Sequence, residues 1–131
     1  MGSEYAFAQK IPYAKIRNQR GEFVTPDANS ISAAASGEIP ADTRCSITNA
    51  DAAGAYPIST FTWMILYKEQ NYSDRSKEQA QATLDLVQYI LSDEAQNITS
   101  EVHYAPLPAK AKELSIANLK SVTYDGVAIM Q

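Results

Sequence analysis

Cysteine and histidine are scarce in this sequence, with one of each among 131 residues. A single cysteine forms no internal disulfide. No pair of histidine or cysteine residues has the spacing of a zinc site, and the acidic residues do not alternate as they do in a calcium-binding loop. We therefore expect no metal site and no cofactor.

The chain also lacks an excess of basic residues and a long apolar run. Its 11 Lys and Arg against 15 Asp and Glu give a formal net charge of −4, which argues against a nucleic-acid partner, because that binding needs a basic face. No apolar run reaches the roughly 20 residues that span a bilayer, and no basic start followed by an apolar stretch predicts a secretion signal in this chain. The 45% hydrophobic content fits a globular chain with a core of its own.

The most apolar stretch begins after Pro57. It contains Phe61, Trp63, Met64, Ile65 and Leu66. Proline is tolerated at a strand entrance, and aromatic and β-branched residues suit a sheet that is covered on both faces. The pattern predicts a buried strand at residues 60–67.

Helical periodicity dominates the second half of the chain. Apolar residues recur at three- and four-residue intervals after Asp74 and predict a long helix, with Ser76 and Gln79 as a capping box. A shorter helix begins at Ser92, and another covers residues 110–121 after two prolines. The tail after Tyr124 has no periodicity that predicts an element.

The first half predicts short elements. These are a helix at residues 4–9, a hairpin of residues 13–17 and 22–24, a helix capped by Thr25 and ended by Gly37, and a strand at residues 45–48. The turn-rich stretch from Asn49 to Tyr56 is the candidate boundary between two parts of the chain.

Four motifs occur in order along the chain. They are EYAFA at residues 4–8, IPYAKI at residues 11–16, AYPIS with the following FTW at residues 55–63, and YAPLP at residues 104–108. Their order and spacing resemble the later part of periplasmic phosphate-binding proteins, the soluble receptors of phosphate ABC importers. The resemblance covers nearly the whole chain.

The resemblance implies an α/β fold class: a partial type II periplasmic-binding-protein fold that contains pieces of both lobes. Residues 1–52 would be a remnant of the second lobe, and residues 53–131 the C-terminal part of the first. The strand at residues 60–67 would then lack its sheet neighbours and leave edge amides uncovered. We expect strand exchange, dimerisation or a complementing N-terminal segment to supply them.

The resemblance also implies a function, the substrate-binding component of a phosphate ABC transporter. Its parent protein would bind phosphate, dock on the transporter's membrane subunits and work in the periplasm or another extracytoplasmic space. The family holds phosphate with a Thr-Phe pair, with Ser and Asp on later loops, and with an Arg followed by a Ser-Gly-Thr loop. We expect these motifs upstream of this segment. A truncated or split receptor that acts as an interaction module without phosphate is the alternative.

Few residues are candidates for a site. Tyr56, Ser59 and Thr60 could edge a cleft at a crossing between lobes, or their hydroxyls could satisfy local backbone groups. Cys45 and His103 are the nucleophile and base of a third alternative, a Cys/His hydrolase, but no further pattern supports it. The other interpretation is an inert strand cysteine and a surface or capping histidine, and we expect no enzyme.

Overall fold

The computed structural model describes residues 3–130, which form five helices and two small antiparallel sheets. The helices are α1 (Ser3–Ala8), α2 (Ala28–Ala34), α3 (Lys77–Ile90), α4 (Asp93–Glu101) and α5 (Ala109–Lys120). The strands are β1 (Ile16–Arg17) with β2 (Phe23–Val24), and β3 (Thr123–Tyr124) with β4 (Val127–Ala128). None of the helices in this part of the chain is both long and apolar enough to cross a membrane.

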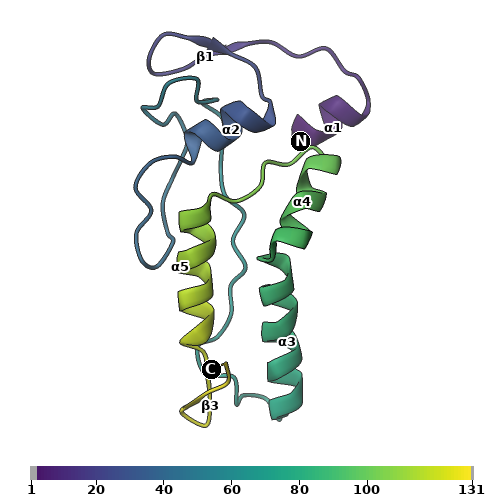
Figure 1. Ribbon diagram of the computed structural model, residues 1–131, viewed down its shortest axis with the longest axis vertical. Coiled ribbons are helices and arrows are strands. Elements are labelled where there is room, and N and C mark those ends of the chain that lie inside the picture. The colour runs from purple at the N-terminus through teal and green to yellow at the C-terminus, as the bar shows by residue number, and fades with distance from the viewer. Residues whose placement is uncertain (1–2, 131) are drawn as a thin grey trace.

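The molecule is elongated, with its two longest helices along its length (Figure 1). Helices α3 and α5 run in opposite directions, and the extended chain before α3 passes alongside them. Helices α1 and α2 and the first hairpin gather at one end, beyond α4, whereas the β3–β4 hairpin lies at the other end. The chain is thus mixed helix and strand, with most of its regular structure in helices.

Capping residues set the start of the central helices. Ser76 Oγ accepts a hydrogen bond of 3.3 Å from the amide of Gln79, and Gln79 Oε1 accepts one of 2.9 Å from the amide of Ser76. This confirms the predicted capping box, which satisfies two amides that have no partner within the helix. Ser92 caps α4 through one such bond, since its Oγ accepts a hydrogen bond of 3.2 Å from the amide of Ala95.

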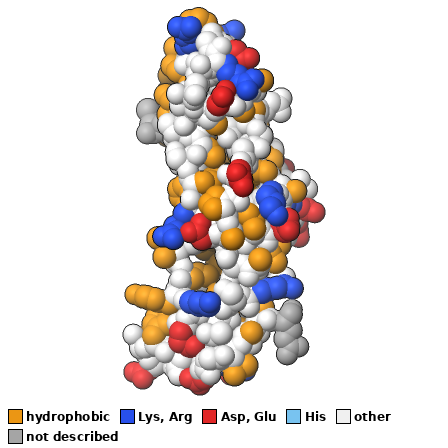
Figure 2. Space-filling view, turned by 90° about the vertical axis from the view of Figure 1, so that its left-hand side faces the viewer, with side chains coloured by type: hydrophobic (Ala, Val, Ile, Leu, Met, Phe, Trp, Pro, Cys, Tyr) orange, Lys and Arg blue, Asp and Glu red, His pale blue; other side chains and the backbone are white. Residues whose placement is uncertain are grey.

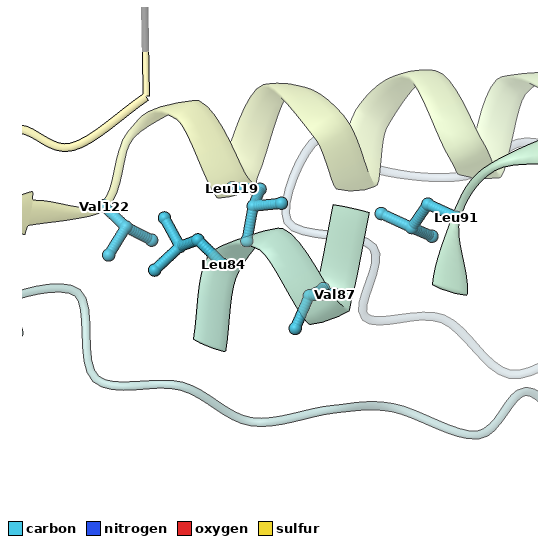
Figure 3. Packing of buried hydrophobic residues seen from close by; sticks show 5 residues of the cluster. All are labelled: Leu84, Val87, Leu91, Leu119 and Val122. Atoms are coloured by element: carbon cyan, nitrogen blue, oxygen red, sulfur yellow. The ribbon is translucent and has the colours of Figure 1, made fainter. Parts of the chain in front are cut away.

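The main core lies between α3 and α5. It consists of Leu84, Val87, Leu91, Leu119 and Val122 (Figure 3). Leu84 is completely buried, and its side chain points toward Val122 in Figure 3, with Leu119 of α5 beside it. Leu66, from the extended segment, packs against this cluster from outside. The helical periodicity predicted this apolar face of α3, and the structure confirms it for Leu84, Val87 and Leu91. The same periodicity placed Leu86 on this face, which is wrong, since Leu86 is 56% exposed.

A buried glutamine fixes the junction between α3, α4 and the chain before α5. Gln96 is 8% exposed; its Nε2 donates to the carbonyl of Ile90 at 2.8 Å, and its Oε1 accepts from the amide of Leu107 at 2.7 Å. One side chain thereby satisfies two backbone groups at the end of one helix and the approach to another.

The predicted buried strand at residues 60–67 is wrong. This segment is extended but pairs with no strand among residues 3–130, and Ile65 is 93% exposed. Aromatic and β-branched residues favour an extended backbone, but a strand also needs a neighbour with free backbone groups. The segment lies beside helices, whose amides and carbonyls already bond within the helix.

Other local predictions also need correction. The strand at residues 45–48 is wrong, since these residues belong to no ladder. Asp27 rather than Thr25 caps α2, because its carboxylate accepts from the amide of Ser30 at 2.9 Å. The tail forms a hairpin that periodicity missed. Its signal is the dipeptide Asp125-Gly126, whose φ angles of 52° and 73° fit a type I′ turn.

Candidate functional site

An apolar cavity of about 920 Å³ lies between the extended segment, the loop at residues 42–46, α3 and α5. Its lining includes Phe61, Trp63, Leu66, Ile90 and Leu107. The walls come from segments that are far apart in the sequence, so the cavity forms only when the chain is folded. Figure 2 shows apolar and charged side chains interspersed over one long side of the molecule.

Two hydrogen bonds hold the loop that walls the cavity. Trp63 Nε1 donates to the carbonyl of Thr43 at 3.1 Å, and Asn118 Nδ2 of α5 donates to the carbonyl of Ala41 at 2.9 Å. The charged residues of the loop, Asp42 and Arg44, pair with each other at 2.8 Å. The amide and side chain of Arg44 hold the pKa of Asp42 below its ordinary value. The lining of the cavity therefore suits apolar groups. Asp42 and Arg44 neutralise each other's charge.

The three cleft-edge candidates lie at the start of the extended segment, and none of them lines the cavity. Ser59 is 4% exposed, and its Oγ donates to the carbonyl of Tyr56 at 2.8 Å. Thr60 Oγ1 donates to the carbonyl of Phe61 at 3.1 Å. Both hydroxyls thus bond to local backbone in this structure, and a role for these residues in a ligand cleft stays a prediction.

Cys45 and His103 have different surroundings. Cys45 lines the apolar cavity, whereas His103 follows α4 at a positive φ of 63°, with its ring 5.7 Å from that of Phe7. His103 is not among the residues that line the cavity, and no hydrogen bond joins the two residues in the described part of the chain. A thiol needs a base within hydrogen-bond reach for nucleophilic catalysis, so this geometry gives no support to the hydrolase.

Two acidic residues that the sequence did not single out hold loops in place. The carboxylate of Glu69 accepts from the amides of Asn71, Asp125 and Gly126, at 2.9 to 3.0 Å. These bonds lower the pKa of Glu69 to about 2, and the bond from the Asn71 amide has the largest effect. Glu22 accepts from Asn18 Nδ2 at 2.7 Å and from the amide of Gly54 at 2.8 Å, and these bonds lower its pKa. Both carboxylates are satisfied from within the chain.

Most arginine side chains are also engaged. Arg20 pairs with Asp51 at 2.8 Å. Arg75 donates to Thr83 Oγ1 and, at 3.0 Å, to the carbonyl of Gln79. With the Arg44 pair, three of the four arginines have partners inside the chain. No group of three or more metal-ligating side chains occurs among the residues that the structure describes.

Comparison with known proteins finds relatives that are named phosphate-binding protein PstS. No family model matches the sequence. The chain is 34% identical over 107 residues to phosphate-binding protein PstS of Xylella fastidiosa (strain Temecula1 / ATCC 700964), a match that covers 79% of this chain and 28% of the relative. It is 33% identical over 98 residues to phosphate-binding protein PstS of Methanocaldococcus jannaschii, covering 68% of this chain and 25% of the relative. The chain thus spans about a quarter of the length of these relatives.

The matches agree with the four motifs at residues 4–8, 11–16, 55–63 and 104–108, which indicated the same kind of protein. An identity of one third over about a hundred residues, found with proteins from two different organisms, confirms that resemblance. This chain is therefore PstS-like, related over the matched residues to the phosphate-binding protein PstS.

Proposed function

We propose that this chain is part of the substrate-binding component of a phosphate ABC transporter and supplies scaffold rather than the phosphate ligands. The observation that carries the proposal is the match to proteins named phosphate-binding protein PstS over most of this chain. In this proposal the parent protein binds phosphate in the periplasm or another extracytoplasmic space and delivers it to the membrane subunits. No catalysis is involved.

The polar groups of the chain support a scaffold role. Buried phosphate needs several donors that converge on one point, from arginine, hydroxyls or free backbone amides. Here Arg20, Arg44 and Arg75 have partners within the chain, and the large cavity is lined mainly by apolar side chains. The phosphate ligands, in this proposal, lie in the part of the PstS-like protein that this chain does not match.

The proposal assigns residues 1–52 to a remnant of the second lobe and residues 53–131 to the C-terminal part of the first, in a partial type II periplasmic-binding-protein fold. The arrangement in Figure 1 supports this division, since α1, α2 and the first hairpin lie at the opposite end of the molecule from the β3–β4 hairpin. The two parts also contact each other, through the hydrogen bond of 3.2 Å from Asn18 Nδ2 to the carbonyl of Ala55 and through the rings of Phe7 and His103.

A pair of calorimetric titrations tests the proposal. In the first, inorganic phosphate is titrated into this chain alone, and we expect no micromolar binding. In the second, the matched residues of this chain replace those of the Xylella fastidiosa protein, and phosphate is titrated into the chimera and into its unmodified parent. We expect the chimera to keep the affinity of the parent, because the exchanged segment supplies scaffold.

The outcomes separate the possibilities. Micromolar binding by this chain alone would show that it carries a ligand shell. A chimera that is folded by circular dichroism but does not bind phosphate would contradict the proposed role. That result would favour the second candidate, an interaction module without phosphate, for which the exposed apolar residues Met64, Ile65 and Tyr67 are the supporting observation.

A further inference from the structure

We propose that Asp125 is a modification site that rearranges to isoaspartate in water, and that Glu69 and Asn71 suppress this reaction while the chain is folded. The inference is independent of the proposed function, because it concerns the chemistry of one turn and not a ligand. The reacting groups are the side-chain carboxyl group of Asp125 and the backbone nitrogen of Gly126.

The reaction needs no reagent except water. The nitrogen of Gly126 attacks the side-chain carboxyl carbon of Asp125 and forms an N–C bond, and the hydroxyl of the protonated carboxyl group leaves with the amide proton as water. The product is a cyclic succinimide. When water then adds to the ring, cleavage at one carbonyl restores aspartate. Cleavage at the other carbonyl leaves isoaspartate, in which the main chain runs through the former side-chain carbons.

The sequence and the turn favour this reaction at Asp125. Gly126 has no Cβ that would hinder the approach of its own nitrogen to the carboxyl carbon. Both residues are exposed to water in the turn between β3 and β4, and no other aspartate in the sequence precedes a glycine. Asp125 is therefore the aspartate at which isoaspartate should form first when the chain is unfolded.

The fold holds both reacting groups against the chain just before α3. The amide of Gly126 donates to Glu69 Oε2 at 3.0 Å, and the amide of Asp125 donates to Glu69 Oε1, also at 3.0 Å. Asn71 Nδ2 donates to Oδ1 of the Asp125 carboxylate. Ring closure requires the carboxyl group to turn toward the next amide. It must therefore break the bond with Asn71 and free the Gly126 amide from Glu69.

The charge of Glu69 adds to this restraint. The nitrogen of Gly126 must give up its proton to attack, and a carboxylate beside it disfavours the negative charge that develops there. The Glu69 carboxylate, with its pKa held at about 2, is also a weak base for that proton near neutral pH. The junction thus slows the reaction through geometry and through charge, and ring closure requires the turn to open first.

Incubation of the purified chain at about pH 5 tests the proposal, because a small fraction of ordinary carboxyl groups is protonated there while Glu69 keeps its charge. Isoaspartate and aspartate have the same mass, so proteolytic peptides are separated by chromatography and identified by electron-transfer fragmentation. We expect isoaspartate at Asp125 to form at least about tenfold more slowly in the folded chain than in the chain unfolded in guanidinium chloride, because the folded turn opens only rarely.

Two variants separate the local contacts from the overall stability of the fold. Asn71→Ala frees the Asp125 carboxylate but keeps the Glu69 side chain, and isoaspartate should form several times faster than in the unmodified folded chain. The matched control is Gln96→Ala, which removes hydrogen bonds to Ile90 and Leu107 but none to the turn. It should keep the rate of the unmodified folded chain. In guanidinium chloride all three chains should react at the same rate.

The contrary outcomes are equally specific. Equal rates in the folded and the unfolded chain would overturn the proposal, as would an unfolded chain in which Asp125 stays unmodified. An unchanged rate in Asn71→Ala would also overturn it. A reaction in Gln96→Ala as fast as in Asn71→Ala would do the same, because overall unfolding and not the contacts of the turn would then set the rate.

Discussion

The carboxylate of Glu69 accepts a hydrogen bond of 2.9 Å from the hydroxyl of Thr123, which lies 54 residues later in the chain. Backbone bonds reinforce this contact: the amide of Gln70 donates to the carbonyl of Thr123, and the amide of Thr123 donates to the carbonyl of Lys68, both at 2.8 Å. The end of the extended segment is thereby joined to the C-terminal hairpin. The contact holds that hairpin against the chain just before α3.

Acid should weaken this junction. The folded protein holds the pKa of Glu69 at about 2, below its ordinary value of 4.5. A carboxyl group whose pKa is lower in the folded than in the unfolded protein contributes its full stabilisation at pH values above its unfolded-state pKa. This stabilisation is lost as the pH falls toward and through its folded-state pKa. We expect Glu69→Gln to lower the melting temperature at pH 7, and the difference from the unmodified chain to shrink between pH 4.5 and 2. Thermal unfolding at several pH values measures it.

The control for that experiment is Glu38→Gln, at an exposed loop carboxylate. Its melting temperature should follow that of the unmodified chain at every pH. A Glu69→Gln curve that stays parallel to the unmodified curve down to pH 2 would show that the carboxylate does not stabilise the hairpin junction through its charge.

Truncation of Leu84 should remove much of the stability of the helical core. This side chain is completely buried between α3 and α5, and Leu84→Ala leaves a cavity that costs about 2 to 5 kcal/mol of unfolding free energy. Urea denaturation measures the loss. Leu86→Ala, on the exposed side of the same helix, should change the unfolding free energy by less than about 0.5 kcal/mol. Equal losses for the two variants would contradict the packing of Leu84 in the core.

Replacement of Gln96 should loosen the α3–α4 junction. Gln96→Ala removes the partner of the Leu107 amide and of the Ile90 carbonyl, and a buried backbone group without a partner costs about 1 to 3 kcal/mol. Chemical denaturation should show this loss, and exchange of the Leu107 amide should become faster. Gln88→Ala, on the exposed surface of α3, is the comparison. Equal stability of the two variants would contradict the prediction. It would mean that water satisfies the Leu107 amide and the Ile90 carbonyl when the glutamine side chain is removed.

The C-terminal turn should be sensitive to a side chain at Gly126, whose φ of 73° lies in the left-handed region. Gly126→Ala should destabilise the hairpin by about 1 kcal/mol, because a Cβ is unfavourable at that φ. Gly37 has no positive φ, and a Cβ added there would meet no atom within 4 Å, so Gly37→Ala should be neutral or stabilising. Thermal unfolding of the two alanine variants compares them directly, and a larger loss for Gly37→Ala would contradict the turn geometry.

Local signals predicted the elements whose stabilising contacts lie close together in the sequence. The Ser76 and Gln79 pair marked the start of α3, and the turn at residues 18–21 marked the β1–β2 hairpin. The C-terminal hairpin could have been found from Asp125-Gly126, which is a strong turn signal in its own right. The candidate site was less predictable, since Tyr56, Ser59 and Thr60 lie outside the cavity and the residues around it were not foreseen as neighbours.

The sequence by itself determined the helices, the capping box of α3 and the relationship to phosphate-binding protein PstS, because periodicity, capping pairs and family motifs each lie within a short stretch of chain. Only the tertiary structure decided what residues 60–67 do. Their composition favours an extended backbone, but a strand exists only where a neighbour offers free amides and carbonyls, and the described fold places helices beside them. Contacts between distant segments, such as Glu69 with Thr123, depend on that same three-dimensional arrangement.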